Sequence, residues 1–89
     1  MGRYVIEREL PGAGELDEQQ LHDISARSNE VLAGMSDIEW VQSWVTDDKL
    51  YCVYDAANPE DIAEHARQGG FPCDRVSPVT GTISPETGR

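Results

Sequence analysis

The pattern of apolar and polar residues divides the chain into strands that alternate with helices. Alternation at every second position predicts strands at residues 4–9, 38–45, 50–55 and, more weakly, 74–79. Helical spacing of apolar residues predicts helices at residues 17–35 and 58–68, the second introduced by Asn58 and Pro59. The order β-α-β-β-α-β predicts an α+β, ferredoxin-like fold: a four-stranded antiparallel sheet with two helices on one face.

The central hairpin holds both tryptophans of the chain. Regular alternation from Ile38 to Val45 predicts that Trp40 and Trp44 lie on the same face of the sheet. The following strand, residues 50–55, is apolar on both faces, which is typical of a strand covered on both sides. Because two helices cover only one face, we expect a second copy of the chain to cover the other face in a homodimer.

The length of 89 residues is that of one domain. We expect this domain to span residues 1–79 and to be followed by a flexible tail at residues 80–89, where Gly, Ser, Thr and Pro dominate. No apolar run approaches membrane-spanning length, and the N-terminal residues have no apolar signal-peptide core. A cytoplasmic location is therefore the expectation.

The net charge narrows the possible partners. Seventeen acidic residues against seven basic ones give a net charge of −10, which repels phosphate backbones and anionic lipids. We therefore expect neither nucleic acid nor membrane as a partner. The sequence also contains no glycine-rich phosphate loop, nucleophile elbow, paired CxxC motif or HExxH motif. No catalytic signature is present.

Several short stretches of the sequence resemble a known family. They are residues 3–8 at the start, 51–56 (Tyr-Cys-Val-Tyr-Asp-Ala) in the central hairpin, and 64–66 (Glu-His-Ala) in the second helix. Together they make residues 3–79 similar to small bacterial ferredoxin-like domains of unknown function, a family that includes nickel-binding proteins. The resemblance implies a dimer and a divalent transition metal such as nickel, but no particular reaction.

Two residues are the best candidates for metal ligands. Nickel, copper and zinc favour imidazole and thiolate ligands, and the chain offers two histidines and two cysteines. His65 lies three residues after Ile62 on the second predicted helix and leans toward the sheet, and Cys52 lies in the middle of a strand. Structural roles stay open for both, as a hydrogen-bonded histidine and a small buried cysteine.

A second hypothesis needs no metal. Some ferredoxin-like dimers enclose an apolar cavity between sheet and helices, and here Trp40, Trp44 and Tyr54 would line it, with Asp55 or His65 positioned to move a proton.

Of the two hypotheses, the first is preferred, and we expect a small non-catalytic binding protein for a divalent, nickel-like metal. A cofactor-free enzyme or small-molecule binder that uses such a cavity is the alternative.

Overall fold

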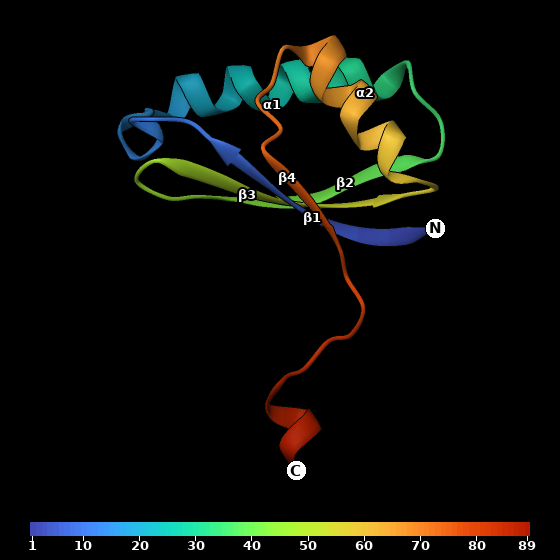
Figure 1. Ribbon diagram of the computed structural model, residues 1–89. Helices are drawn as coiled ribbons and strands as arrows, with labels where there is room; N and C mark the ends of the chain where they lie inside the picture. The colour runs from blue at the N-terminus through green and yellow to red at the C-terminus, as the bar shows by residue number, and fades with distance from the viewer.

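The computed structural model describes residues 1–89 and shows a four-stranded antiparallel sheet with both helices on one side (Figure 1). The main elements are β1 (Gly2–Glu9), α1 (Glu18–Ala33), β2 (Ile38–Val45), β3 (Lys49–Ala56), α2 (Pro59–Gly69) and β4 (Arg75–Pro78). The strand order is β2-β3-β1-β4, so both crossovers pass over the same face. The predicted fold class is confirmed. Two short 3-10 helices, η1 (Ala13–Glu15) and η2 (Pro85–Gly88), were not predicted.

Local side-chain chemistry sets where the helices begin. At the start of α1, the Asp17 carboxylate accepts a hydrogen bond from the Gln20 amide at 2.8 Å, and the Gln20 side chain accepts one from the Asp17 amide at 3.0 Å. At the start of α2, the Asn58 side chain accepts from the Asp61 amide at 3.1 Å. Gly70 ends α2 with a φ of 69°, a left-handed conformation that favours glycine. Both helices thus lie within two residues of their predicted bounds.

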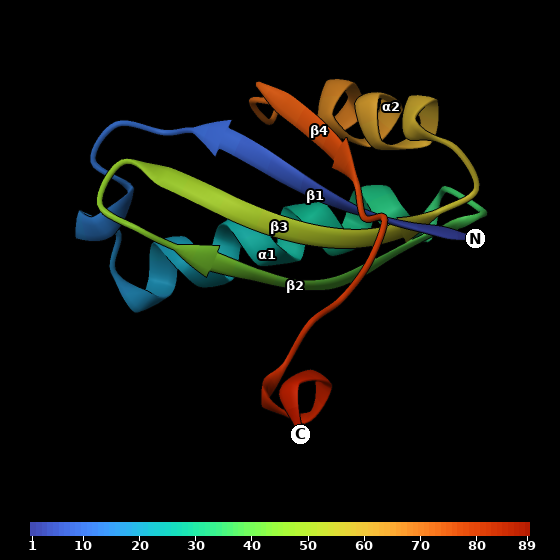
Figure 2. The ribbon, with the colours of Figure 1, turned by 60° about the horizontal axis from the view of Figure 1, so that its bottom comes forward.

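The core lies between the sheet and the helices. Its buried residues come from three strands and from α2: Ile6, Ile38, Cys52, Tyr54, Ala56 and Ile62. The opposite side of the sheet, here called the outer face, carries the alternate side chains of the same strands, among them Val5, Tyr51 and Val53. Neither helix covers this outer face (Figure 2).

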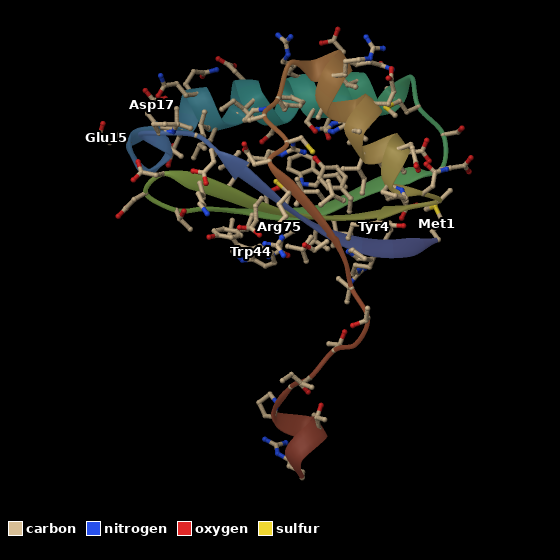
Figure 3. All side chains as sticks on the ribbon, in the orientation of Figure 1. Met1, Tyr4, Glu15, Asp17, Trp44 and Arg75 are labelled. Carbon is tan, nitrogen blue, oxygen red and sulfur yellow. The ribbon has the colours of Figure 1, made fainter.

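The prediction that both tryptophans share a face is wrong. Trp40 pairs with Tyr54, but Gln42 pairs with Val53, so Val41 is an extra residue in β2 and forms a β-bulge. Beyond the bulge, the side chains of β2 therefore point to the opposite faces from those expected for a regular strand. Trp40 therefore packs against the core, whereas Trp44 lies on the outer face, where it is 51% exposed (Figure 3).

The chain leaves the fold after β4. The Val79 amide still donates a hydrogen bond to the Arg3 carbonyl at 2.9 Å, and residues 80–89 are all exposed. Figure 1 shows this segment running away from the sheet on the side opposite the helices and ending in η2. The domain bounds at residues 1–79 and the flexibility of the tail both stay predictions. No helix in the chain has the length and apolarity needed to cross a membrane.

Candidate functional site

A cavity of about 230 Å³ lies between α1 and the helix-facing side of the sheet. The helix contributes Leu21, Ile24, Ser25 and Ser28 to its wall. The strands contribute Arg8, Trp40, Ser43, Cys52 and Tyr54. Val45, Leu50 and Arg8, which lie in one row across β2, β3 and β1, also line the cavity, and Val45 is 43% exposed. Phe71 and Pro72 from the loop after α2 complete this part of the wall.

Arg8 lines the cavity and reaches the loop after α2. It is the seventh residue of β1, so strand alternation places it on the same side as Ile6, and only 3% of it is exposed. Its Nη1 donates a hydrogen bond to the Pro72 carbonyl, but its Nη2 is buried with no hydrogen-bond partner. The guanidinium carbon lies 5.9 Å from the Tyr54 ring centre and 5.8 Å from that of Phe71.

The Arg8 guanidinium keeps its positive charge. Burial acts to lower the pKa of Arg8, but Cys52 and Tyr54 act in the opposite direction, and the net pKa is raised. Burial also raises the pKa of Tyr54, although the charge of Arg8 opposes this, so the phenol stays protonated at neutral pH. The cavity wall thus holds one buried positive charge beside a neutral phenol.

His65 lies on α2 behind Tyr54, outside the cavity wall. It is fully buried, its ring centre lies 5.3 Å from that of Tyr54, and its Nε2 shares a hydrogen bond of 3.1 Å with the Ser28 hydroxyl. Its Nδ1 is buried without a partner. Burial, and secondly the charge of Arg8, lower the pKa of His65 to about 4, so the imidazole is neutral at pH 7.

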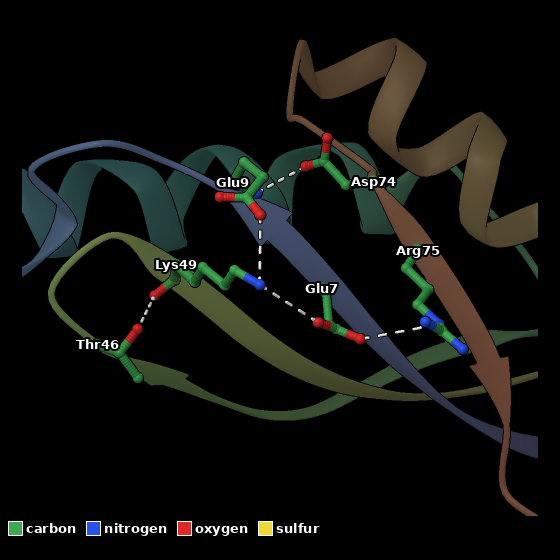
Figure 4. Close-up of polar contacts among 6 residues, drawn as sticks. All are labelled: Glu7, Glu9, Thr46, Lys49, Asp74 and Arg75. Carbon is green, nitrogen blue, oxygen red and sulfur yellow. Dashed lines mark hydrogen bonds and ion pairs between the residues drawn. The ribbon is translucent and has the colours of Figure 1, made fainter.

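The outer face combines apolar and charged side chains. Lys49 Nζ lies 3.6 Å from a Glu7 carboxylate oxygen and 3.3 Å from one of Glu9, and Arg75 Nε lies 4.0 Å from Glu7 (Figure 4). The strand register places Trp44 opposite Tyr51, which is itself opposite Glu7. Tyr51 therefore lies between the exposed indole and Glu7.

The sequence was compared with known protein families. Residues 4–79 match a family described as "Nickel responsive protein SCO4226-like". The chain belongs to this family. The match confirms the resemblance drawn from the sequence, and it covers nearly the same residues. A comparison with curated proteins found no match.

A solved structure supports the fold of this SCO4226-like chain. The crystal structure of SCO4226 from Streptomyces coelicolor A3(2) superimposes with a TM-score of 0.77 at 15% sequence identity. The alignment covers 91% of this chain and 99% of that one. At so low an identity, the likeness shows the shared fold alone.

The description of the SCO4226-like family raises the question of whether one chain provides a metal site. No group of three or more His, Cys, Asp or Glu side chains is placed to hold an ion. Cys52 lines the cavity and His65 lies behind it, with its Nε2 bonded to Ser28 and the positive charge of Arg8 acting on it. A nearby buried cation opposes the binding of a second cation. Within one chain, these donors do not fit a divalent metal.

The other candidate residues lie on two sides of the sheet. Trp40 and Tyr54 line the cavity, as expected from the sequence. Trp44 lies on the outer face because of the bulge, and so does Asp55, whose carboxylate accepts a hydrogen bond from Arg3 Nε at 2.8 Å. Trp44 and Asp55 therefore do not line the cavity. Sequence reasoning missed Arg8, although its position two residues after Ile6 places a charge on the core-facing side.

Proposed function

We propose that this SCO4226-like protein is a small non-catalytic binding protein and that its ligand occupies the cavity between α1 and the sheet. The observation that carries the proposal is the cavity itself, because protein interiors are normally packed with few voids larger than a water molecule. A wall of aromatic and aliphatic side chains with a few polar groups at one end is typical of small-molecule sites.

The two proton-transfer residues expected for the cofactor-free enzyme, Asp55 and His65, both lie outside the cavity wall. General acid–base catalysis needs a group within hydrogen-bond reach of the substrate. Asp55 lies on the outer face and is paired with Arg3, while His65 is not part of the cavity wall and is held by Ser28. The cofactor-free enzyme alternative therefore lacks both proton-transfer residues that were expected for it.

The two tryptophans provide an internal test of the binding site. In a ¹H–¹⁵N spectrum each indole N–H gives its own signal, and Trp40 Nε1 donates to the Ser43 hydroxyl at 2.9 Å in the cavity wall. We expect small aromatic and aliphatic acids or their amides, such as phenylacetate, hexanoate, phenylacetamide and hexanamide, to shift the Trp40 signal and leave that of Trp44 in place. If none of these compounds shifted the Trp40 signal, the proposal would be wrong.

A matched pair of variants on α1 separates the cavity from the surface. Ser25 lines the cavity, whereas Asn29, one turn later on the same helix, is exposed. We expect Ser25→Phe to fill the cavity and abolish the ligand-induced shift of the Trp40 signal, and we expect Asn29→Phe to preserve it. An unchanged response in a folded Ser25→Phe protein would contradict the assignment of the site.

We also propose that two copies of the chain associate through the outer face. Val5, Tyr51, Val53 and the exposed Trp44 form a partly apolar surface there, and no element of the same chain covers it. A second copy is the simplest cover, because each copy presents the same surface to the other.

Nickel binding is the second candidate function, and the family description is the observation that favours it. Since one chain lacks three suitable donors, we propose that any nickel ion is shared between copies, with His65 and Cys52 as the ligands to test first. Because both residues are buried on the helix-facing side of the sheet, an ion held by them would be shared through a contact other than the outer face. Calorimetric titration with nickel chloride should then give fewer than one ion per chain. We expect weaker binding by His65→Ala and Cys52→Ala than by the exposed control His22→Ala. No binding at micromolar nickel would contradict this candidate, and equal binding by all variants would exclude these two ligands.

A further inference from the structure

We propose that the cavity binds the carboxylate group of a small organic acid and that Arg8 is the group that receives it. This inference rests on the proposed function of the cavity as a ligand site and names the class of ligand. It starts from a charge that the protein itself leaves without a counterpart.

Arg8 is the buried cation of a strongly acidic chain, yet no carboxylate is paired with it. The chain has seventeen acidic residues, and its ion pairs involve Arg3, His22, Lys49, Arg67, Arg75 and Arg89 but not Arg8. A buried charge without a partner is costly, and buried charges in proteins are normally paired. A ligand that brings its own negative charge would supply the missing partner.

The free donor belongs to a residue that lines the cavity. Arg8 Nη1 is already bonded to the Pro72 carbonyl, while Nη2 is buried without an acceptor in a residue that lines the cavity. A bond from guanidinium to carboxylate is charge-assisted, and such bonds are roughly twice as strong as those between neutral groups. Tyr54 and Ser28 line the same cavity, and their hydroxyls are further donors.

The rest of the cavity determines the body of the acid. Leu21, Ile24 and Trp40 line the same cavity as Arg8, so the body must be apolar. A volume of about 230 Å³ lies below the roughly 300–1,000 Å³ of pockets for drug-sized ligands, so the acid must be small. A monocarboxylate with a single ring or a short alkyl chain meets both conditions.

The net charge of the protein makes the salt dependence informative. A chain of charge −10 repels anions at long range, and added salt screens this repulsion. The contact with the buried Arg8 is screened much less. We therefore expect the affinity for the acid to stay constant or to rise between low and physiological salt, whereas an acid held by exposed cations would bind more weakly.

The test compares acids with amides of the same shape. We expect phenylacetate and hexanoate to bind at least about tenfold more tightly than phenylacetamide and hexanamide, measured by calorimetry and by the shift of the Trp40 indole signal. Arg8→Met should remove this preference. The matched control Arg3→Met, which removes a cation from the outer face, should retain it. Circular dichroism establishes whether each variant is folded.

The outcomes separate this inference from the proposed function. Equal binding of acids and amides by the wild-type protein would overturn the inference while leaving the cavity as a ligand site, and it requires no variant to fold. Binding of neither group would overturn both. A preference for acids that persists in folded Arg8→Met protein would show that another cation holds the carboxylate and would also overturn the inference.

Discussion

Arg8 and His65 are two basic residues in the same core that carry different charges at neutral pH. Arg8 remains charged because a guanidinium holds its proton even when buried. His65 gives up its charge because burial and the charge of Arg8 both disfavour the imidazolium. Ser28 on α1 and the rings of Tyr54 and Phe71 complete the surroundings of His65, and none of them offers a negative charge at neutral pH.

The low pKa of His65 predicts that folding stability falls in acid. In the unfolded chain the imidazole has its ordinary pKa of 6.5, and in the folded protein the value is about 4. Between these values the unfolded state binds more protons, so this contribution is complete above pH 6.5 and is lost as the pH falls toward 4. The loss is roughly 3 kcal/mol.

Urea unfolding of wild-type and His65→Gln proteins at pH 7.5, 5.5 and 4.5 measures this effect, because the variant retains polar atoms but does not titrate. The free energy of unfolding should fall more steeply with acidification in the wild type than in the variant. A His65 that titrates near pH 6.5 in the folded protein, as followed by NMR, would show that the expected pKa shift is absent.

At the residue scale, the sequence predicts burial better than it predicts roles. The spacing of Ile62 and His65 on α2 correctly indicates that both side chains point inward. Trp40 and Tyr54 were also correctly expected near the space between sheet and helices. Arg8 was overlooked because an arginine in a polar stretch of strand is ordinarily exposed, and only its burial in the fold reveals the unpaired charge.

Among the elements, α2 and the loop that follows it bring Phe71 to the cavity wall. A Cβ at Gly69 would overlap with the ring of Phe71, which lines the cavity and whose ring centre lies 5.4 Å from that of His65. A glycine at this position thus allows Phe71 to fold back against the end of α2.

We therefore predict that Gly69→Ala displaces Phe71 and destabilises the protein by about 1–3 kcal/mol, the usual cost of overpacking. Gly34→Ala is the matched control at the end of α1, because a Cβ there would make only an ordinary contact of 3.7 Å with the Val31 carbonyl. Denaturant unfolding of both variants gives the comparison. Equal stability of the two would mean that the Phe71 ring moves at no cost.

The elements also show where sequence reasoning succeeds and where it fails. The helix starts were predictable because Asn58 and Pro59 act within one turn of the chain. The bulge at Val41 was not, because it depends on how β2 pairs with β3, and a regular strand with the same sequence is equally acceptable locally. The error in the position of Trp44 follows entirely from that one extra residue.

On the scale of the whole molecule, the outer face leads to a prediction about assembly. We expect sedimentation to show a dimer at micromolar concentration, and we expect added salt to strengthen it because each copy carries a charge of −10. Trp44→Glu should shift the protein to monomers, since it places a charge on the outer face in the same row as Glu7, with Tyr51 between them. Ala26→Glu adds the same charge at an exposed position of α1 and should leave the dimer intact. A wild-type monomer under these conditions would contradict the proposed association.

The direction in which the chain departs after Pro78 has a practical consequence for such experiments. Because residues 80–89 extend from the side of the sheet opposite the helices, an affinity tag or surface anchor fused to Arg89 would be tethered beneath that side. Such an attachment would crowd any neighbouring molecule there, whereas the cavity, which lies on the helix side of the sheet, would stay accessible. Immobilised protein prepared in this way is suited to ligand measurements, and untagged protein should be used for sedimentation.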